Sequence, residues 1–527
     1  MSEVVTIIGA GPTAISFLYN YLQLIDEGDI LPRTIYLIEK RRAFGPGCAY
    51  EFDLSSNIMN TKAGFITPFY DQPGHFFRWL KSEKKTWRVQ YPDLQVNEDS
   101  YVPRALFGLY LQRQMTWLAE SAKKRRVDII QIHAECKDIQ YSETSYIVKT
   151  DCNVTIRADF IFFFCGTLSA KSLPAVSGSS LVFASPYPIQ TLQQRIPVDA
   201  AVGIVGARLS CIDAVVGLVE QGHQGTITIH SRTGYFPSVR GTQGRITPKA
   251  LTAEQVDALV RLKGSLRLQD LVDLAQMEIA IVEGEEECVD FQLPSPPQDL
   301  ATFLRDEISK AAAPRSWQAV LYCTNSIIDR LWSLLHEEDK IEFLDKYFSM
   351  FMAYRVSIPM ENARKILRYL ESGQLRFCAG DFHVDLDASS RPRVTLNGQN
   401  DESFCYDFLI NAIGSPRAVR NLDSDLISKL LERGVMTAND LGGVAVDASS
   451  YQLIGADGTL HPRLYAVGEL TTGAFFFTSA LDINARHARL CAVSFAKSFS
   501  RRIAETDDAE RSFALPQPSS SVTKLME

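Results

Sequence analysis

Residues 9–14 read GAGPTA and directly follow an apolar, β-branched run over residues 4–8. In a turn that binds a dinucleotide, the first glycine permits a tight bend and the second lets the backbone approach a diphosphate, while a small residue after them packs the next helix onto the strand. The free N–H groups and the dipole at the start of that helix favour an anion. The residues that we predict to contact a cofactor in this turn are Gly9, Gly11, Pro12, Thr13 and Ala14.

A carboxylate stands where such a turn needs one for a ribose. Glu39 ends the next predicted strand, residues 34–39, and its oxygens could accept hydrogen bonds from ribose hydroxyls. It lies 30 residues after Gly9, more than the usual spacing of about 20, and the loop-like stretch DEGDILPR accounts for the excess. We predict that Glu39 and the adjacent Lys40 contact the cofactor. The alternative is a glycine turn with no ligand and an exposed glutamate.

A second turn, within VGIVGARLSCID at residues 202–213, departs from this pattern. Gly206 permits the bend, but Arg208 stands where the second glycine is expected. A guanidinium group is planar and carries several N–H donors, so it suits phosphate oxygens. We therefore predict that Gly206, Arg208 and Ser210 contact a second, more highly charged dinucleotide.

The end of the following strand, residues 226–230, indicates which dinucleotide this is. An NAD site carries an acid there for the ribose hydroxyls, whereas an NADP site carries a cation for the 2′-phosphate. Ser231 and Arg232 occupy this place, and Arg232 lies 26 residues after Gly206. Two such turns in one chain indicate a flavin and a nicotinamide cofactor, and the arginine favours NADPH. The alternative is a scaffold that has lost its nucleotide together with the second glycine.

These turns require an α/β framework. Continuous apolar strands alternate with helices that have one apolar face, which predicts two doubly wound, Rossmann-like units with parallel sheets. Between about 250 and 350 the periodicity is helical, so we predict a mainly helical insertion with a capping box of Thr252 and Gln255 at its start. The predicted domains are an FAD-binding domain in two parts (1–195 and a returning part, 375–504), an NADPH-binding domain (196–374) that contains the helical insertion (about 245–350), and a flexible tail (505–527).

The composition argues against several classes of protein. Of the 527 residues, 46% are hydrophobic and 22% are charged, and the net charge of −8 argues against nucleic acid and anionic membranes as partners. No apolar run reaches the roughly 18 residues needed to cross a bilayer, and the N-terminus lacks the basic region of a signal peptide. The ten cysteines form no CxxC pair. We therefore expect a cytoplasmic protein with reduced thiols and no structural metal.

Further sequence blocks carry a resemblance to a known family. In chain order they are FGPGCAY (44–50), MNTKA (59–63), DQPGHFFRWL (71–80), YVPR (101–104), SRTGYFP (231–237), LGGVAVD (441–447) and YAVGELTTGAFFFTSALDINARHA (465–488). Together with the two turns they resemble the bacterial FAD-NAD(P)-binding family of flavin monooxygenases that includes urate hydroxylases and L-aspartate N-hydroxylases. More distantly, they resemble the ornithine and lysine N-hydroxylases. The resemblance covers nearly the whole chain apart from the tail.

The resemblance implies FAD in the first unit, NADPH in the second, and oxygen transfer through a flavin C4a-hydroperoxide. It places Asn60 beside the isoalloxazine and Lys62 near the substrate or the nicotinamide. Taken alone, Asn60 could equally cap a backbone group, and Arg104 could be a surface arginine rather than a contact of a cofactor or a substrate anion. The further cofactor-binding residues that we assign are Asn60, Arg104, Gly468, Glu469, Leu481, Asp482 and Ile483.

The predicted function is that of an FAD-dependent, NADPH-consuming monooxygenase. Its substrates would be O₂ and a small polar, aspartate-like amino acid, whose amine is N-hydroxylated in secondary metabolism. The candidate catalytic residues are Asn60 and Lys62, and the candidate substrate-binding residues are Lys62, Arg240 and Arg355. The alternatives are C-hydroxylation of a urate-like heterocycle, a non-oxygenating NAD(P)H-dependent flavin reductase, and a non-enzymatic nucleotide-binding scaffold. A homo-oligomer is left open.

Overall fold

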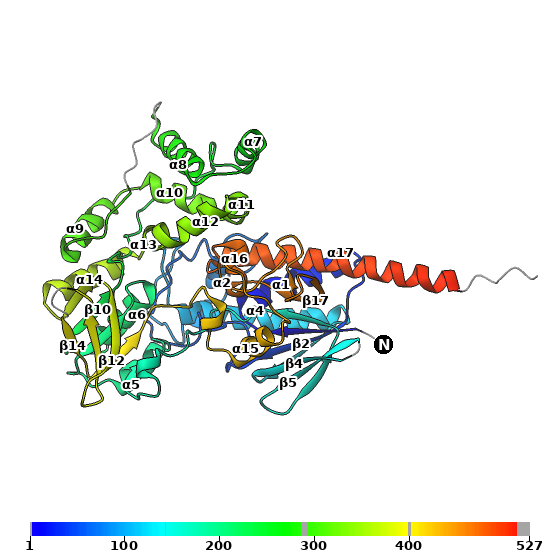
Figure 1. The fold of residues 1–527 in the computed structure, drawn as a ribbon, viewed down its shortest axis with the longest axis horizontal. Helices are drawn as coiled ribbons and strands as arrows, with labels where there is room; N and C mark the ends of the chain where they lie inside the picture. Colours follow the sequence, from blue (N-terminus) through cyan, green and yellow to red (C-terminus); the bar gives the residue numbers. More distant parts are fainter. Residues whose placement is uncertain (1–2, 143, 286–292, 399–401, 514–527) are drawn as a thin grey trace, which may run out of the picture.

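The computed structural model describes residues 3–142, 144–285, 293–398 and 402–513. Two units, each built on a sheet, lie side by side, and an arm of helices stands over the line where they meet (Figure 1). This arrangement confirms the predicted α/β class with two doubly wound units and a mainly helical insertion.

The first unit is built on a six-stranded sheet in the order β16-β17-β7-β1-β2-β3. All neighbours pair in parallel except the edge pair β16–β17. β7 reads FIFF and is buried along its whole length, as expected for a parallel sheet with both faces covered. The strands are β1 (Val4–Ile8), β2 (Thr34–Glu39), β3 (Asp128–His133), β7 (Phe160–Phe163), β16 (Gln452–Ile454) and β17 (Leu460–Ala466).

Helices and a small antiparallel sheet complete the first unit. α1 and α17 pack against each other, and α4 packs on α1. The small sheet consists of β4 (Cys136–Ser142), β5 (Ser145–Thr150) and β6 (Thr155–Ala158). The helices are α1 (Pro12–Asp26), α2 (His75–Ser82), α3 (Lys84–Trp87), α4 (Arg104–Lys124), α15 (Asp425–Glu432), α16 (Thr472–Phe475) and α17 (Leu481–Phe513).

The second unit is built on a five-stranded sheet in the order β11-β10-β9-β15-β8, with all neighbours parallel. A three-stranded antiparallel sheet adjoins it, and α5, α6 and α14 belong to the same unit. Its strands are β8 (Val182–Phe183), β9 (Val202–Val205), β10 (Ile227–Ser231), β11 (Leu375–Ala379), β12 (Phe382–Leu386), β13 (Pro392–Leu396), β14 (Ser403–Cys405) and β15 (Phe408–Asn411), and its helices are α5 (Ile189–Arg195), α6 (Leu209–Glu220) and α14 (Met360–Glu371).

The second sheet extends beyond the range predicted for the second domain. We predicted residues 196–374, but β8 precedes that range, and β11 and β15 follow it. β15 lies in the returning part that we assigned to the first domain, but it pairs with β9 in the second sheet and not with a strand of the first sheet. The chain returns to the first sheet only at β16 and β17.

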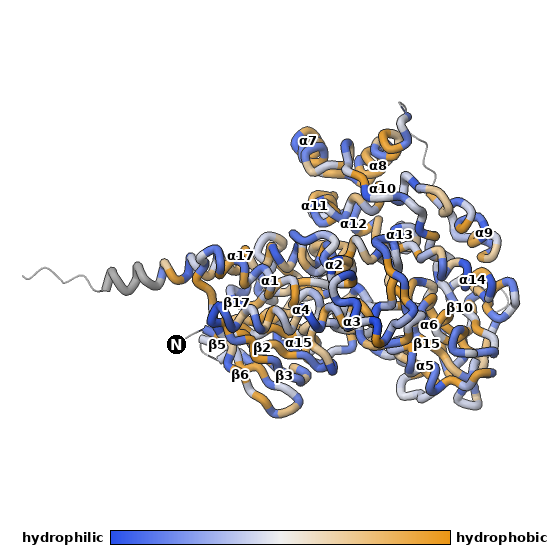
Figure 2. Tube along the Cα trace, turned by 180° about the vertical axis from the view of Figure 1, so that it is seen from behind, coloured by the Kyte–Doolittle hydropathy of each residue, from blue (hydrophilic) through white to orange (hydrophobic). Residues whose placement is uncertain are grey.

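The arm contains the predicted helical insertion. Seen from behind, apolar and polar positions alternate along its outer helices α7 and α8 (Figure 2). At the start of α7, the Thr252 hydroxyl accepts a hydrogen bond from the Gln255 amide at 3.3 Å, which is one half of the predicted capping box. The elements are α7 (Ala253–Lys263), α8 (Leu268–Glu283), α9 (Leu300–Lys310), α10 (Ser316–Cys323), α11 (Ile328–Leu334), α12 (Glu337–Glu342), a π-helical turn (Phe343–Tyr347) and α13 (Phe348–Arg355).

The arm is fixed to the first unit by an aromatic contact. Trp332 of α11 stacks on Phe476 with ring centroids 4.7 Å apart, and its indole N–H donates to the Gly473 carbonyl at 2.8 Å. Phe476 has a φ of +63°, which a bulky residue rarely adopts. The surrounding packing therefore stabilises a strained turn at the point where the arm meets the first unit.

The C-terminal segment differs from the prediction of a flexible tail over 505–527. α17 continues to Phe513 and extends away from the rest of the molecule (Figure 1), and the remaining residues lie outside the described part of the chain. Residues 504–513 read AETDDAERSF and contain several strong helix formers, which explains the continuation. Among the described residues, no helix is long and apolar enough to span a bilayer.

The buried His230 allows a prediction about acid stability. It is fully buried, its Nε2 lies 2.6 Å from the Tyr406 hydroxyl, and burial lowers its pKa to about 4. The unfolded chain therefore takes up a proton first, and stability is lost as the pH falls from about 6.5 through 4, by at most about 3 kcal/mol.

In His230→Gln we expect the melting temperature to fall less steeply between pH 6.5 and 4 than in the wild type, because glutamine does not titrate. Differential scanning calorimetry across this range measures the effect. The other buried histidines titrate in both proteins, so parallel curves would contradict the prediction.

Candidate dinucleotide sites

A cavity lies at the carboxyl ends of β1, β2 and β7, against the first glycine turn. Its walls come from segments far apart in the sequence: this turn, the loop that follows Glu39, the end of β7 and the two segments that flank α16. The lining residues are Gly11, Pro12, Thr13, Glu39, Arg41, Pro46, Gly47, Cys48, Ala49, Tyr50, Phe164, Cys165, Gly166, Thr167, Gly468, Glu469, Thr478, Ser479, Leu481 and Asn484.

The glycine turn shapes the floor of this cavity. Gly9 has a φ of +96°, and a Cβ on it would lie 2.2 Å from the Phe164 carbonyl oxygen, so no larger residue fits. Gly11 faces Gly47, and a Cβ on Gly47 would lie 3.2 Å from the Gly11 Cα. Among the residues that the structure describes, no side chain caps the N-terminus of α1. The free end of the helix therefore faces the cavity as a diphosphate requires.

Glu39 is held in place beside the turn. Its carboxylate accepts hydrogen bonds from the backbone amides of Ala10 at 3.0 Å and Arg41 at 2.9 Å, and the Arg41 guanidinium lies 3.6 Å away. Glu39 is only 4% exposed, yet it lines the cavity. A carboxylate fixed in this way has lone pairs left for two ribose hydroxyls, so the residues present fit the adenosine half of FAD.

The far wall of the cavity carries a half-buried acid, Glu469. Burial raises the pKa of Glu469, and the positive charge of Arg417 opposes the shift. The Arg417 guanidinium donates to the carbonyl oxygens of Leu441 at 2.9 Å and Thr472 at 3.1 Å. Burial also lowers the pKa of Arg417 to about 10. These hydrogen bonds join Arg417 to the segment after β17, which lines this cavity.

Several predicted cofactor residues have other surroundings. Lys40 pairs with Glu135 at 3.0 Å, and Asp482 accepts a hydrogen bond from Asn325 of the arm at 2.8 Å. Ala14 and Ile483 are fully buried in hydrophobic cores, where they support the cavity from behind. Asn60 and Arg104 do not line this cavity, and the Arg104 guanidinium is bound by other groups, described below.

Sequence reasoning also missed residues that line the cavity. They include Arg41, the loop from Pro46 to Tyr50, and Thr478 and Asn484. The signal for the loop was present, because FGPGCAY places small residues just after the ribose acid. Arg41 offered no such signal, since an arginine next to a strand end is commonly a surface residue.

The second turn repeats the geometry of the first. Gly206 has a φ of +104°, and a Cβ there would lie 2.6 Å from the Ala412 carbonyl oxygen. In the described part of the chain no side chain caps α6, which begins after Arg208. The Arg208 side chain points away from the turn toward α13, where its Nη2 lies 3.4 Å from the Ser349 hydroxyl and its guanidinium lies 5.4 Å from the Phe348 ring centroid. The arginine therefore leaves the N-terminus of the helix open.

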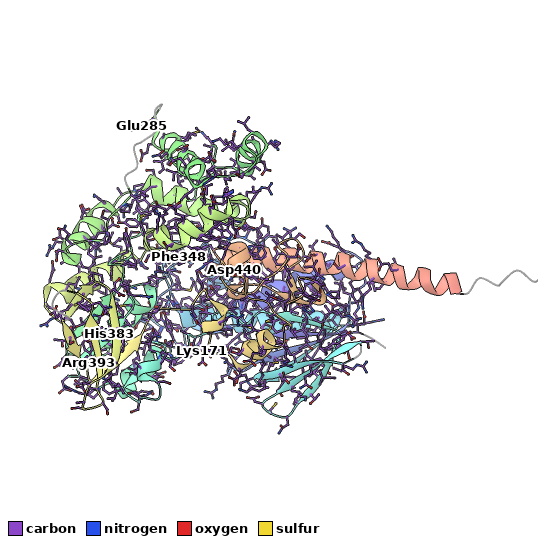
Figure 3. All side chains as sticks on the ribbon, viewed as in Figure 1. Lys171, Glu285, Phe348, His383, Arg393 and Asp440 are labelled. Carbon is purple, nitrogen blue, oxygen red and sulfur yellow. The ribbon has the colours of Figure 1, made fainter. Side chains whose placement is uncertain are left out.

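The base of the arm lies over this second turn. The Ser349 hydroxyl also lies 2.9 Å from that of Thr233, in the loop after β10. Figure 3 labels Phe348 at the base of the arm, to the left of Asp440 of the first unit. Arg232 is exposed at the end of β10, while the Ser231 hydroxyl accepts a hydrogen bond from the Gly234 amide at 3.1 Å. Arg232 is thus free to meet a 2′-phosphate, and Ser231 shapes the loop.

Two arginines lie together where the arm meets both units. Arg240 donates to the Ser357 hydroxyl at 3.2 Å and lies 4.7 Å from the Tyr322 ring centroid. Arg355 is 3% exposed and donates to the Thr324 hydroxyl at 3.0 Å, to the Asn325 side-chain oxygen and to the Leu321 carbonyl, and its Nε has no hydrogen-bond partner among the described residues. Burial lowers the pKa of Arg355 to about 10, and the nearby Arg240 adds to this shift while Asp482 opposes it.

This pair of like charges could bind an anion. Within the described part of the chain, neither guanidinium has a carboxylate at ion-pair distance. Tyr101 of the first unit contacts Arg240. Lys62, the third predicted substrate residue, pairs with Asp99 at 2.9 Å, two residues before Tyr101. The segment from Asp99 to Tyr101 thus contacts both Lys62 and Arg240.

The fold combines two glycine turns of the dinucleotide-binding type with a helical insertion. Within it, residues 6–168 match the family model described as FAD-NAD(P)-binding, so the chain carries an FAD-NAD(P)-binding domain, as the sequence resemblance implied. The uncharacterized protein YdhS of Escherichia coli K12 is 22% identical over 505 residues, covering 85% of this chain and 89% of that protein.

Solved structures with the same fold are N-hydroxylating flavoenzymes. The ornithine N-hydroxylase of Kutzneria sp. 744, with reduced FAD, NADP⁺ and L-ornithine, matches at a TM-score of 0.54 and 16% identity over 95% of this chain and 99% of that one. The ornithine hydroxylase of Pseudomonas aeruginosa matches at 0.56 and 12% over 95% and 100%. The L-lysine 6-monooxygenase of Pseudomonas syringae matches at 0.56 and 13% over 94% and 100%. The chain therefore has the fold of flavin-dependent N-hydroxylating monooxygenases.

Proposed function

We propose that this protein is an FAD-dependent, NADPH-consuming monooxygenase that N-hydroxylates the amine of a small amino acid with an anionic, aspartate-like side chain. The observation that carries the proposal is the Arg240–Arg355 pair, two cations without carboxylate partners among the described residues, at the junction of the two dinucleotide units and the arm. An arginine pair of this kind favours a carboxylate ligand.

The bound cofactors would supply the redox chemistry, in which NADPH provides a hydride and the reduced flavin activates O₂. The chain binds and orients them. Glu39 would accept the ribose hydroxyls of FAD, and the start of α1 would face its diphosphate. Arg232, at the end of β10, would take the 2′-phosphate of NADPH, and Arg208 would approach its diphosphate from the side of α13.

The arm would close the substrate region from above. Arg240 and Arg355 would hold the substrate carboxylates, and Lys62 and Asn60 are proposed to lie between substrate and cofactors. Asn325 of the arm donates to Asp482 at 2.8 Å, next to Leu481 of the first cavity. This contact would tie substrate binding to the exclusion of water around the flavin.

The test is a screen of the FAD-loaded protein. NADPH consumption is measured with a panel of amino acids and with urate, and products are identified by mass spectrometry. The proposal requires consumption stimulated by an acidic amino acid and a product with one added oxygen on nitrogen. Stimulation by urate alone would support C-hydroxylation instead, and NADPH oxidation without an oxygenated product would support a flavin reductase.

The reaction should also depend on pH in one direction. Only the neutral amine has a lone pair for attack on an electrophilic oxygen, so kcat/KM is expected to rise with pH until the amine of the substrate is deprotonated. Steady-state kinetics between pH 6.5 and 9 would measure this rise. A profile that is flat over this range while product is formed would argue against an amine nucleophile.

A further inference from the structure

A buried polar cluster joins the two units away from the lining of the first cavity. Arg104, at the start of α4 in the first unit, and Asp213, on α6 in the second, form an ion pair with Nη2 and Oδ2 2.9 Å apart. The Tyr187 hydroxyl donates to the same carboxylate oxygen at 2.5 Å and accepts from Arg104 Nη1 at 3.3 Å. Arg104 Nε donates to the Ile58 carbonyl at 3.2 Å. All three guanidinium nitrogens thus have partners within the protein, and the assignment of Arg104 as a cofactor contact stays a prediction.

A second polar contact crosses the same junction. The carboxylate of Asp53, from the first unit, accepts hydrogen bonds from the backbone amides of Ile189 at 2.9 Å and Gln190 at 3.0 Å, at the start of α5. The adjacent Leu54 packs against the hydrophobic core of the second unit. The two units are therefore joined by hydrogen bonds, which restrict the direction of the contact as well as its distance.

The ion pair is one helical turn from each dinucleotide site. On the first side, Gly108 follows Arg104 by one turn of α4, and a Cβ on it would lie 1.9 Å from the carbonyl oxygen of Tyr50, which lines the first cavity. On the second side, Asp213 follows the first residue of α6 by one turn. Ser210, beside the second glycine turn, contacts the Tyr187 hydroxyl.

Stability alone does not account for this pair. The side chains of Arg104 and Asp213 are 14% and 4% exposed, and the desolvation of two buried charges offsets most of their attraction. Burial raises the pKa of Asp213, and the charge of Arg104 opposes this shift. A buried ion pair that is also hydrogen-bonded to Tyr187 instead fixes how α4 and α6, the helices that carry its members, are oriented relative to each other.

We infer that Arg104 and Asp213, held together by Tyr187, are positioning residues that set the distance and angle between the two cofactors. The inference rests on the proposed function, because hydride transfer requires the reacting atoms to approach to about 3–3.5 Å, and a displacement of 1 Å can cost on the order of 100-fold in rate. The ion pair directly links α4, which supports the first cavity, to α6, which begins at the second turn.

The test compares Asp213→Asn and Tyr187→Phe with the wild type. We expect both variants to bind FAD normally and, once reduced chemically by dithionite, to react with O₂ at the wild-type rate. The rate constant for reduction by saturating NADPH should fall about 100-fold in Asp213→Asn and about 10-fold in Tyr187→Phe. The long-wavelength charge-transfer absorbance of the nicotinamide stacked on flavin should weaken in parallel. A merely structural role would not separate these steps.

Hydrogen exchange of the Ile189 and Gln190 amides provides a readout that needs no cofactor, and it should accelerate in both variants. If Asp213→Asn does not fold, the double variant R104L/D213L replaces it, since an apolar pair of similar volume keeps the junction packed without fixing its orientation. The matched control is Asp385→Asn, which breaks the 2.6 Å pair with Arg393 at the far edge of the second unit (Figure 3) and should change none of these quantities.

Reduction by NADPH within twofold of the wild type in the folded variants would overturn the inference. A wild-type protein that binds FAD but is reduced by neither NADPH nor NADH would overturn the proposed function, and with it this inference. The two failures are distinguishable, because the first appears only in the variants and the second already in the wild type.

Discussion

Gly11→Val is expected to lower the affinity for FAD at least 100-fold. Gly11 lies at the floor of the first cavity, opposite Gly47, and its φ is not in the left-handed region, so the valine backbone is not strained. A Cβ on Gly11 would meet the Gly47 Cα at 3.4 Å, which is an ordinary contact, and the protein should fold. The two valine methyl groups would occupy the place where a diphosphate must approach the start of α1.

The measurement is titration of the apoprotein with FAD, followed by flavin fluorescence, together with a thermal melt. Gly244→Val is the matched control, because a Cβ on Gly244 meets nothing within 4 Å. It should leave both FAD affinity and melting temperature unchanged. Normal FAD binding by a folded Gly11→Val protein would show that the flavin does not use this turn.

Local sequence patterns predict the first turn because its chemistry is contained within a few residues. Gly9 must adopt a positive φ against Phe164, and Glu39 ends the neighbouring parallel strand, so strand length alone brings its carboxylate to the turn. The doubly wound fold follows for the same reason, since apolar strands and one-faced helices are read from periodicity. Both features depend on spacing within one strand–turn–helix unit.

Arg104 shows what such patterns cannot predict. Its type and its position after Pro103 are compatible with a cofactor contact, but its ion-pair partner is Asp213 of the other unit, and only the way the two units meet brings the two residues together. The same problem arises for β15. Its apolar run could pair in either sheet, and only its tertiary contacts with β9 place it in the second sheet. Lys40 turned toward Glu135 for a similar reason, through the pairing of β2 with β3.

Arg355→Met is expected to raise the KM for the amino-acid substrate about 100-fold with little change in kcat. Loss of charge-assisted hydrogen bonds to a carboxylate is worth about 3 kcal/mol, which corresponds to this factor. FAD and NADPH binding should be unaffected. The melting temperature should fall only moderately, because the substitution leaves the buried acceptors of Thr324 and Asn325 without this donor but strands no carboxylate among the described residues, and methionine fills the site with apolar volume.

Arg315→Met provides the contrast that separates binding from structure. Arg315 is also buried in the arm, but both its terminal nitrogens bind Glu307 at 2.7 Å. Its removal leaves a buried, uncompensated carboxylate, so we expect the melting temperature to fall sharply while the KM of the remaining folded protein stays near the wild-type value. Steady-state kinetics and thermal melts of the two variants should therefore show opposite patterns. A large loss of stability in Arg355→Met with an unchanged KM would assign Arg355 to the scaffold, because a residue that binds the substrate must change the KM when it is removed.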